Sequence, residues 1–182
     1  MRRSRLEKVA VRLVAAAGPA DVVIVGGLAV ALHGYIRATD DIDLLARGAL
    51  ADVQARLAAK GINAKLFRGD RPGGDFPCLK GELDGIRFDV LPELAPVDWE
   101  GAPELKVGGV SLRIVDLPGL LALKFRAAGP QDLLDAAALV LLHPEIAPVA
   151  QRLATARGLA SRLASLLANP RLRAQIRGTR RR

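Results

Sequence analysis

Between Asp41 and Ala46 the chain alternates acidic and apolar residues, which is the pattern of a β-strand with one buried face. Residues two apart on a strand point to the same side, so Asp41 and Asp43 share a face while Ile42 and Leu44 can pack into a core. Two carboxylates on one face repel each other unless a cation lies between them. The strand therefore predicts a cation site on its polar face.

A third carboxylate, Asp89, lies between Phe88 and Val90, whose side chains would point to the opposite face of a strand. A neighbouring strand carrying Asp89 would complete an oxygen cage for Mg²⁺. Two such ions stabilise both the entering and the leaving oxygen of an in-line phosphoryl displacement. Asp84 and Glu93 are alternatives nearby, but the alternation favours Asp89.

A glycine pair, Gly26-Gly27, follows the β-branched run Asp21 to Val25 and precedes an Ala-rich, helix-compatible stretch. A strand–Gly-Gly–helix turn lets the backbone approach phosphates closely, and the N–H groups at the helix start favour an anion. The other interpretation is a tight turn without a ligand. Thirteen residues separate Gly27 from Asp41, which suffices for a short helix and a return to a neighbouring strand.

The remaining patterns predict an α+β protein in which a mixed β-sheet is flanked by helices and followed by a helical segment. Hairpins are expected around the turns Asp84-Gly85 and Gly108-Gly109. We expect residues 1–115 to form the α/β core and 116–170 a helical part packed on it. The basic tail, 171–182, is expected to be disordered, and the Gly/Pro-rich stretch 69–77 has no assigned role.

Composition narrows the setting of the protein. The single cysteine, Cys78, excludes an intramolecular disulfide and a zinc cluster and fits the cytoplasm. The longest apolar run, 22–32, is too short to span a bilayer, so we expect no membrane partner. The net charge of +8 suits a polyanionic partner such as RNA or a nucleotide, although an arginine-rich composition alone would also produce it.

The block from Gly26-Gly27 to Asp41-Ile42-Asp43 resembles the signature of the nucleotidyltransferase superfamily, with its DNA polymerase β-like minimal core. With His33-Gly34, Arg37 and Thr39 between them, it is similar to the AbiEii-type nucleotidyltransferases, which include toxins of type IV toxin–antitoxin systems. The resemblance covers about residues 22 to 142.

Further along the chain, Lys124 followed by Asp132 and Asp135 is similar to the downstream helices of the same group. Gly129-Pro130 departs from that pattern, because a basic residue is expected there. Lys124 could equally be a lysine whose stem lies along an apolar helix flank.

The resemblance implies that Asp41 and Asp43 hold two Mg²⁺ ions, with Mn²⁺ as an alternative. Asp89 would bind the ion that activates the acceptor hydroxyl and could serve as its base. The nucleotide-binding residues implied by the resemblance are Gly26, Gly27, Arg37, Thr39 and Lys124.

The function expected from these residues is that of an NTP-dependent enzyme, with ATP among its candidate substrates. It would transfer a nucleoside monophosphate to an acceptor hydroxyl and release pyrophosphate. An RNA or tRNA 3′ end or a protein is the favoured acceptor, and an antitoxin-like protein is a possible partner. Two alternatives stay open: an aminoglycoside-type small-molecule nucleotidyltransferase, and a non-catalytic module that binds RNA or a partner protein.

Overall fold

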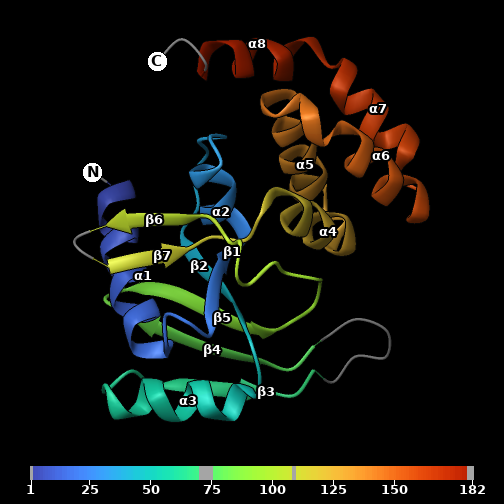
Figure 1. Cartoon of the computed structure of the whole chain (residues 1–182). Coiled ribbons are helices and arrows are strands. Elements are labelled where there is room, and N and C mark those ends of the chain that lie inside the picture. Colours follow the sequence, from blue (N-terminus) through green and yellow to red (C-terminus); the bar gives the residue numbers. More distant parts are fainter. Residues whose placement is uncertain (1, 70–75, 108–109, 180–182) are drawn as a thin grey trace. The chain divides into compact units, whose positions relative to one another are not determined.

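The computed structural model describes residues 2–69, 76–107 and 110–179 (Figure 1). The contacts between residues divide the chain into two units. The first comprises Met1–Leu28 and Ala38–Val115, and the second comprises Ala29–Arg37 and Asp116–Arg182. Sequence patterns alone placed the segment 29–37 in the first part, so its membership of the helical unit is a finding of the structure.

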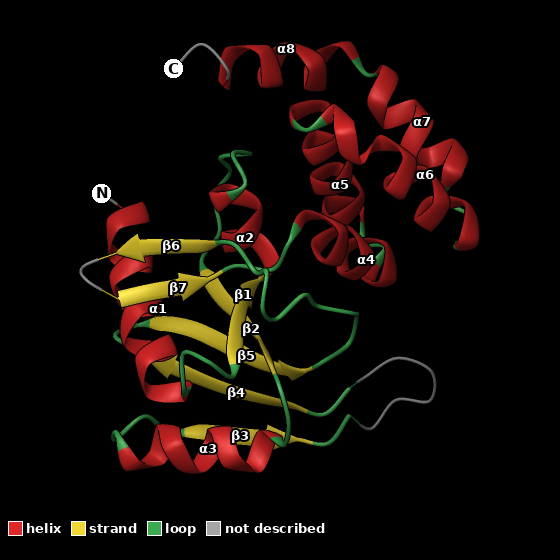
Figure 2. Ribbon diagram, in the orientation of Figure 1, coloured by secondary structure: helices red, strands yellow, loops and turns green. Residues whose placement is uncertain are grey.

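The first unit holds, within the described residues, a five-stranded sheet in the order β1-β2-β5-β4-β3 and a separate pair, β6-β7 (Figure 2). Strand β2 runs parallel to β5, and all other neighbouring strands are antiparallel. The mixed sheet with its helices confirms the predicted α+β class. The strands are β1 (Val22–Val25), β2 (Asp41–Ala46), β3 (Ala64–Phe67), β4 (Cys78–Leu83), β5 (Ile86–Pro92), β6 (Glu104–Val107) and β7 (Val110–Arg113).

Two helices, α1 (Arg2–Ala17) and α3 (Leu50–Ala59), pack against each other and against strands of the first unit. The apolar positions of the central strands supply the core, because Ile42, Leu44 and Val90 have no exposed surface. The intervening acidic positions of β2 remain partly exposed. The alternation in the sequence therefore corresponds to one buried and one polar side of the strand.

The hairpin of β4 and β5 turns at Asp84-Gly85, as predicted. Both residues have positive φ, 53° and 72°, which is the conformation that a two-residue type I′ turn requires. The turn residues of the β6–β7 hairpin, Gly108-Gly109, lie outside the described residues, as do residues 70–75 of the Gly/Pro-rich stretch.

The second unit is helical, and its centre is α5, which packs against α4, α6, α7 and α8. Ala136, Leu139 and Leu133 of α5 are buried. No single helix in the described part of the chain is long and apolar enough to cross a membrane. The helices of the second unit after residue 115 are α4 (Leu117–Ala127), α5 (Pro130–Leu142), α6 (Ala147–Ala156), α7 (Ala160–Ala168) and α8 (Pro170–Thr179), with a 3₁₀ turn at Pro144–Ile146.

The expected disordered tail is instead mostly helix α8. Asn169 accepts hydrogen bonds from the backbone N–H groups of Arg171 and Leu172 and so caps the helix start. Leu172 and Ile176, four residues apart, are buried. Residues 171–179 are therefore helical where disorder was expected, because this apolar pair packs within the unit, and residues 180–182 lie outside the described residues.

Candidate functional site

The three predicted carboxylates lie side by side on the sheet of the first unit. Asp43 pairs with Asp89 in the parallel register of β2 and β5, and paired residues share a face of the sheet. Asp41 lies two residues before Asp43 on the same strand and therefore on the same face. The structure thus brings together Asp41, Asp43 and Asp89 from strands that are separated in sequence.

Lys80 is a further residue of this site that sequence reasoning missed. It is paired with Asp89 across the β4–β5 hairpin, and its Nζ donates to Asp89 Oδ2 at 3.0 Å. The hydrogen bond to Asp89 and the charges around it raise the pKa of Lys80. The sequence contained the signal, because Lys80 and Asp89 are equidistant from the Asp84-Gly85 turn.

Thr39 and Gly26 shape the surroundings of the two carboxylates of β2. The hydroxyl of Thr39 donates to Asp41 Oδ1 at 3.0 Å and so orients that side chain. Gly26 begins α2 (Gly26–Leu32) with φ at 62°. A Cβ atom placed on Gly26 would lie 1.9 Å from Asp43 Oδ2, so only glycine leaves room for this carboxylate.

The chemistry of these donors suits a hard divalent cation, which prefers carboxylate oxygens. The ammonium of Lys80 already balances part of their charge at Asp89. In the described residues no three acidic, histidine or cysteine side chains stand ready around one point to ligate a metal. The hydrogen bond between Lys80 and Asp89 would compete with a cation for that carboxylate.

The two predicted cationic contacts, Arg37 and Lys124, belong to the second unit, where both meet Asp135. Arg37 donates to the two oxygens of Asp135 at 2.7 and 2.8 Å. Lys124 Nζ lies 2.9 Å from Asp135 and 2.9 Å from Asp132. Asp135 has no exposed surface. Sequence reasoning placed Asp135 near a helix start and did not reveal that it joins these two cations.

The charge of Asp135 is stabilised by its partners. Burial alone would raise the pKa of this carboxyl, but the hydrogen bonds from Arg37 and Lys124 and the charge of Lys124 outweigh burial, and the pKa is lowered. Gln131 adds a further hydrogen bond at 2.8 Å. Asp135 is therefore a buried anion that holds segment 29–37 against α5.

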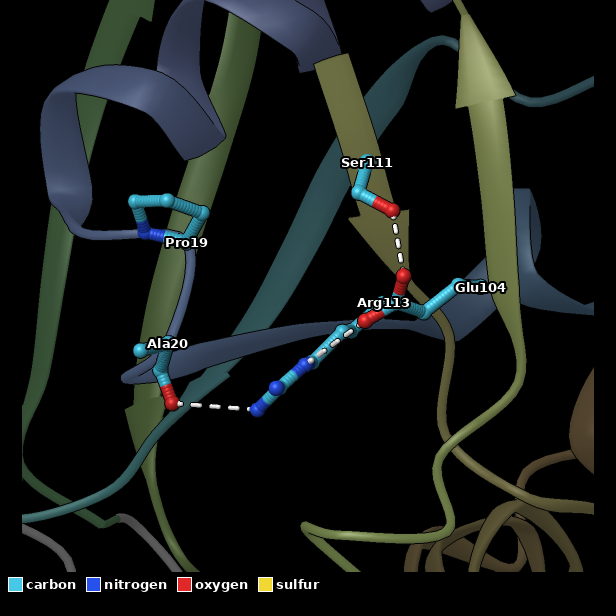
Figure 3. A pocket seen from close by; sticks show the side chains of 5 residues that line it. All are labelled: Pro19, Ala20, Glu104, Ser111 and Arg113. Atoms are coloured by element: carbon cyan, nitrogen blue, oxygen red, sulfur yellow. Dashed lines mark hydrogen bonds and ion pairs between the residues drawn. The ribbon is translucent and has the colours of Figure 1, made fainter.

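A hollow of about 220 Å³ lies elsewhere in the first unit, beside β6 and β7 (Figure 3). Its polar groups bond to one another, because Arg113 donates to Glu104 and to the carbonyl of Ala20, and the hydroxyl of Ser111 donates to Glu104. None of the predicted site residues lines it. The hollow is therefore separate from the carboxylate site.

Comparison with models of protein families and with curated proteins gave no match. Several solved structures are similar to the chain. The antibiotic-resistance factor ANT(2'')-Ia is 21% identical, with a TM-score of 0.53 over 86% of this chain and 94% of that one. A nucleotidyltransferase-like antigenic protein from Paracoccidioides brasiliensis is 16% identical, with a TM-score of 0.46 and 92% of each chain covered. JHP933 from Helicobacter pylori is 14% identical, with a TM-score of 0.42 over 98% of this chain and 90% of that one.

The first of these likenesses extends over nearly the whole of both chains and concerns the fold. The chain therefore has an α+β fold similar to that of ANT(2'')-Ia.

Proposed function

We propose that the chain is a metal-dependent nucleotidyltransferase that transfers a nucleoside monophosphate from an NTP to an acceptor hydroxyl and releases pyrophosphate. The observation that carries the proposal is the register of β2 and β5, which sets Asp89 beside Asp43 and on the face of Asp41. The glycine turn that begins α2 lies against the same Asp43 carboxylate. The likeness of the fold to ANT(2'')-Ia supports the same class of enzyme.

Asp41, Asp43 and Asp89 are the residues that would hold Mg²⁺ or Mn²⁺. When bound, the ions supply charge that stabilises the entering and leaving oxygens of the phosphoryl transfer. Asp89 also accepts the proton of the acceptor hydroxyl in this proposal. Lys80, which bonds to Asp89 in the structure, would then keep that carboxylate in place between turnovers.

The other predicted contacts have distinct roles in the proposal. Thr39 orients Asp41, and the backbone at Gly26-Gly27 approaches the phosphates. Helix α2 has only seven residues, so we assign the phosphate contact to the glycine backbone rather than to a helix dipole. Arg37 and Lys124 are proposed as cations for the phosphates, with Asp135 as the residue that fixes their position.

For the acceptor we favour an RNA 3′ end or a protein hydroxyl over a small molecule. The likeness to an antibiotic-resistance factor is the specific observation that favours a small molecule. The net charge of +8 over the whole protein opposes polycationic antibiotics such as aminoglycosides only at long range, because like charges repel. ATP as one of the candidate nucleotides, an antitoxin-like partner and a cytoplasmic location remain part of the proposal.

The test is to incubate the purified protein with each α-labelled NTP, Mg²⁺ and total RNA. We expect label in RNA or on protein, and a loss to background in Asp41→Asn and Asp43→Asn. Asp40→Asn is the matched control, because the same charge is removed one residue before the site, and we expect it to keep most of the activity. If no label is transferred and NTP binding does not depend on the metal, the chain is a binding module rather than an enzyme.

A further inference from the structure

The charge of the protein is divided unequally between its two units. The first unit contains 15 Lys and Arg and 15 Asp and Glu, whereas the second contains 12 Lys and Arg and 4 Asp and Glu. The whole net charge of +8 therefore resides in the second unit. Segment 147–182 is the extreme case, with nine arginines and no lysine, aspartate or glutamate.

The structure turns this excess outward on three helices. Ala150 and Ala154 of α6, Leu163 of α7 and Ile176 of α8 are buried, so the apolar stripes of the helices face their neighbours within the unit. The arginines lie away from these stripes. Six of them are exposed in the described residues, five on the helices and Arg157 directly after α6: Arg152, Arg157, Arg162, Arg171, Arg173 and Arg177.

The type of cation indicates the type of partner. Guanidinium groups present planar, two-pronged donors that match phosphate oxygens, whereas an ammonium acts as a point charge. No aromatic residue occurs from Ala147 to Arg182, so bases have nothing to stack on. A surface of this composition contacts a phosphate backbone and does not read its sequence.

Two other anionic partners are a membrane surface, which fits less well, and an acidic protein. An anionic membrane surface is bound by helices that also insert an apolar face. Among the described residues, the large exposed apolar side chains are Ile36, Leu66, Phe67 and Phe76, and none of them lies on α6, α7 or α8. Carboxylates of an acidic protein also accept the two-pronged donation of guanidinium, so the experiment below includes polyglutamate as a competing partner.

We propose that the exposed arginines of α6, α7 and α8 form an RNA-binding surface that grips the phosphate backbone without sequence preference. The inference deepens the proposed function. RNA as the acceptor rests on that function, whereas binding of RNA by these arginines can be tested without it. The surface would hold the RNA substrate by its backbone, independently of the carboxylates of the first unit.

The experiment uses the full chain without NTP and a short fluorescent single-stranded RNA, with affinity measured from about 50 to 200 mM salt. The test variant is Arg152→Gln/Arg162→Gln/Arg177→Gln, which removes one arginine from each helix. Since each lost phosphate contact lowers the salt slope by about 0.7, we expect the slope to fall by about 2. At about 100 mM salt the affinity should fall roughly ten- to a hundredfold.

The matched control is Lys60→Gln/Lys65→Gln/Arg68→Gln, which removes the same charge from exposed positions of the first unit. It should keep the wild-type slope. Equal weakening of RNA binding in the test variant and the control would show that binding follows net charge, and this would overturn the proposal. An unchanged salt slope in the helical variant, which is the triple-arginine variant Arg152→Gln/Arg162→Gln/Arg177→Gln, would also overturn it. Comparable binding to anionic lipid vesicles or to polyglutamate, lost in the helical variant, would assign the surface to another partner and overturn it as well.

The two proposals fail in different ways. If RNA binding depends on the three arginines but the protein transfers no label, the RNA-binding surface is supported and the proposed enzyme activity is contradicted. Conversely, if the triple-arginine variant transfers label to RNA with the wild-type KM for RNA, that result would contradict the RNA-binding surface and support the enzyme.

Discussion

Gly26 is the residue whose backbone most directly limits the shape of the carboxylate site. Alanine there would carry both the strain of a positive φ and a collision with Asp43 Oδ2. Gly61 has a similar φ of 71° but nothing within 4 Å of its Cβ position. We expect Gly61→Ala to lower the free energy of unfolding by about 1 kcal/mol, and Gly26→Ala by roughly 1–3 kcal/mol more.

Trp99 is the single tryptophan of the chain and belongs to the first unit, so its fluorescence during urea unfolding reports on the relevant part. The difference between the two variants isolates the collision from the backbone strain that they share. Equal losses of stability would mean that the Asp43 carboxylate moves aside without cost, and that the glycine is not needed for space.

Asp135 is the residue on which we expect the second unit to depend most. Asp135→Asn leaves Lys124 and Arg37 without their buried anion, and we expect it to lower the free energy of unfolding by about 3–5 kcal/mol at neutral pH. Glu100→Gln removes the partner of Arg47 in an exposed pair and should cost less than about 1 kcal/mol. Urea unfolding followed by helical circular dichroism measures both.

The pH dependence of the Asp135 contribution follows from the direction of its shift. Its pKa in the folded protein lies below the ordinary value of 3.8, so its contribution is complete above that value. The contribution is lost as the pH falls through the lower folded pKa. The stability gap between wild type and Asp135→Asn should therefore be constant near neutral pH and close in strong acid. A gap that widened on acidification would contradict a lowered pKa.

At the level of residues, local patterns predicted what strands and turns dictate. The alternation around Asp41 and Asp89 placed both on one polar face, and the register of the strands agrees. Lys80 was missed although the turn at Asp84-Gly85 fixes its partner. The union of Arg37 with Asp135, 98 residues apart, has no local signal, because only the packing of α5 brings the two together.

Among the elements, α8 gives the sharpest contrast between composition and structure. The buried apolar side chains of this arginine-rich helix are Leu172 and Ile176. We expect Leu172→Ala/Ile176→Ala to release the helix, since each buried aliphatic side chain truncated to alanine costs about 2–5 kcal/mol. Limited trypsin digestion should then cut rapidly after Arg173 and Arg177.

The control for α8 is Ala174→Gln, an exposed position on the same helix where tryptic cleavage should stay slow. Rapid cleavage of the wild-type chain within 171–179 would restore the expectation of a disordered tail. The lesson for sequence reading is that two apolar residues four apart can anchor a helix whose overall composition is polar.

Within the whole molecule, the sequence predicted the α+β class and the change to helices after residue 115. It did not predict that segment 29–37 joins the helical unit. That membership depends on Arg37 reaching Asp135 and on His143 Nε2 lying 2.8 Å from the carbonyl of His33, both of them contacts over more than ninety residues of chain. Nothing local in the residues 29–37 distinguishes these partners from any others.

Helix α2 begins in the sheet unit and ends in the helical one. The helical unit is therefore made from two stretches of chain, and residues 38–115 of the sheet unit lie between these stretches in the sequence. This arrangement has a consequence for descent. A single recombination event near residue 115 could not add, remove or exchange the helical unit cleanly, because Arg37 and His33 would stay behind with the sheet. We therefore expect the two units to be inherited together, so that homologues vary in both at once rather than carry one sheet unit beside unrelated helices.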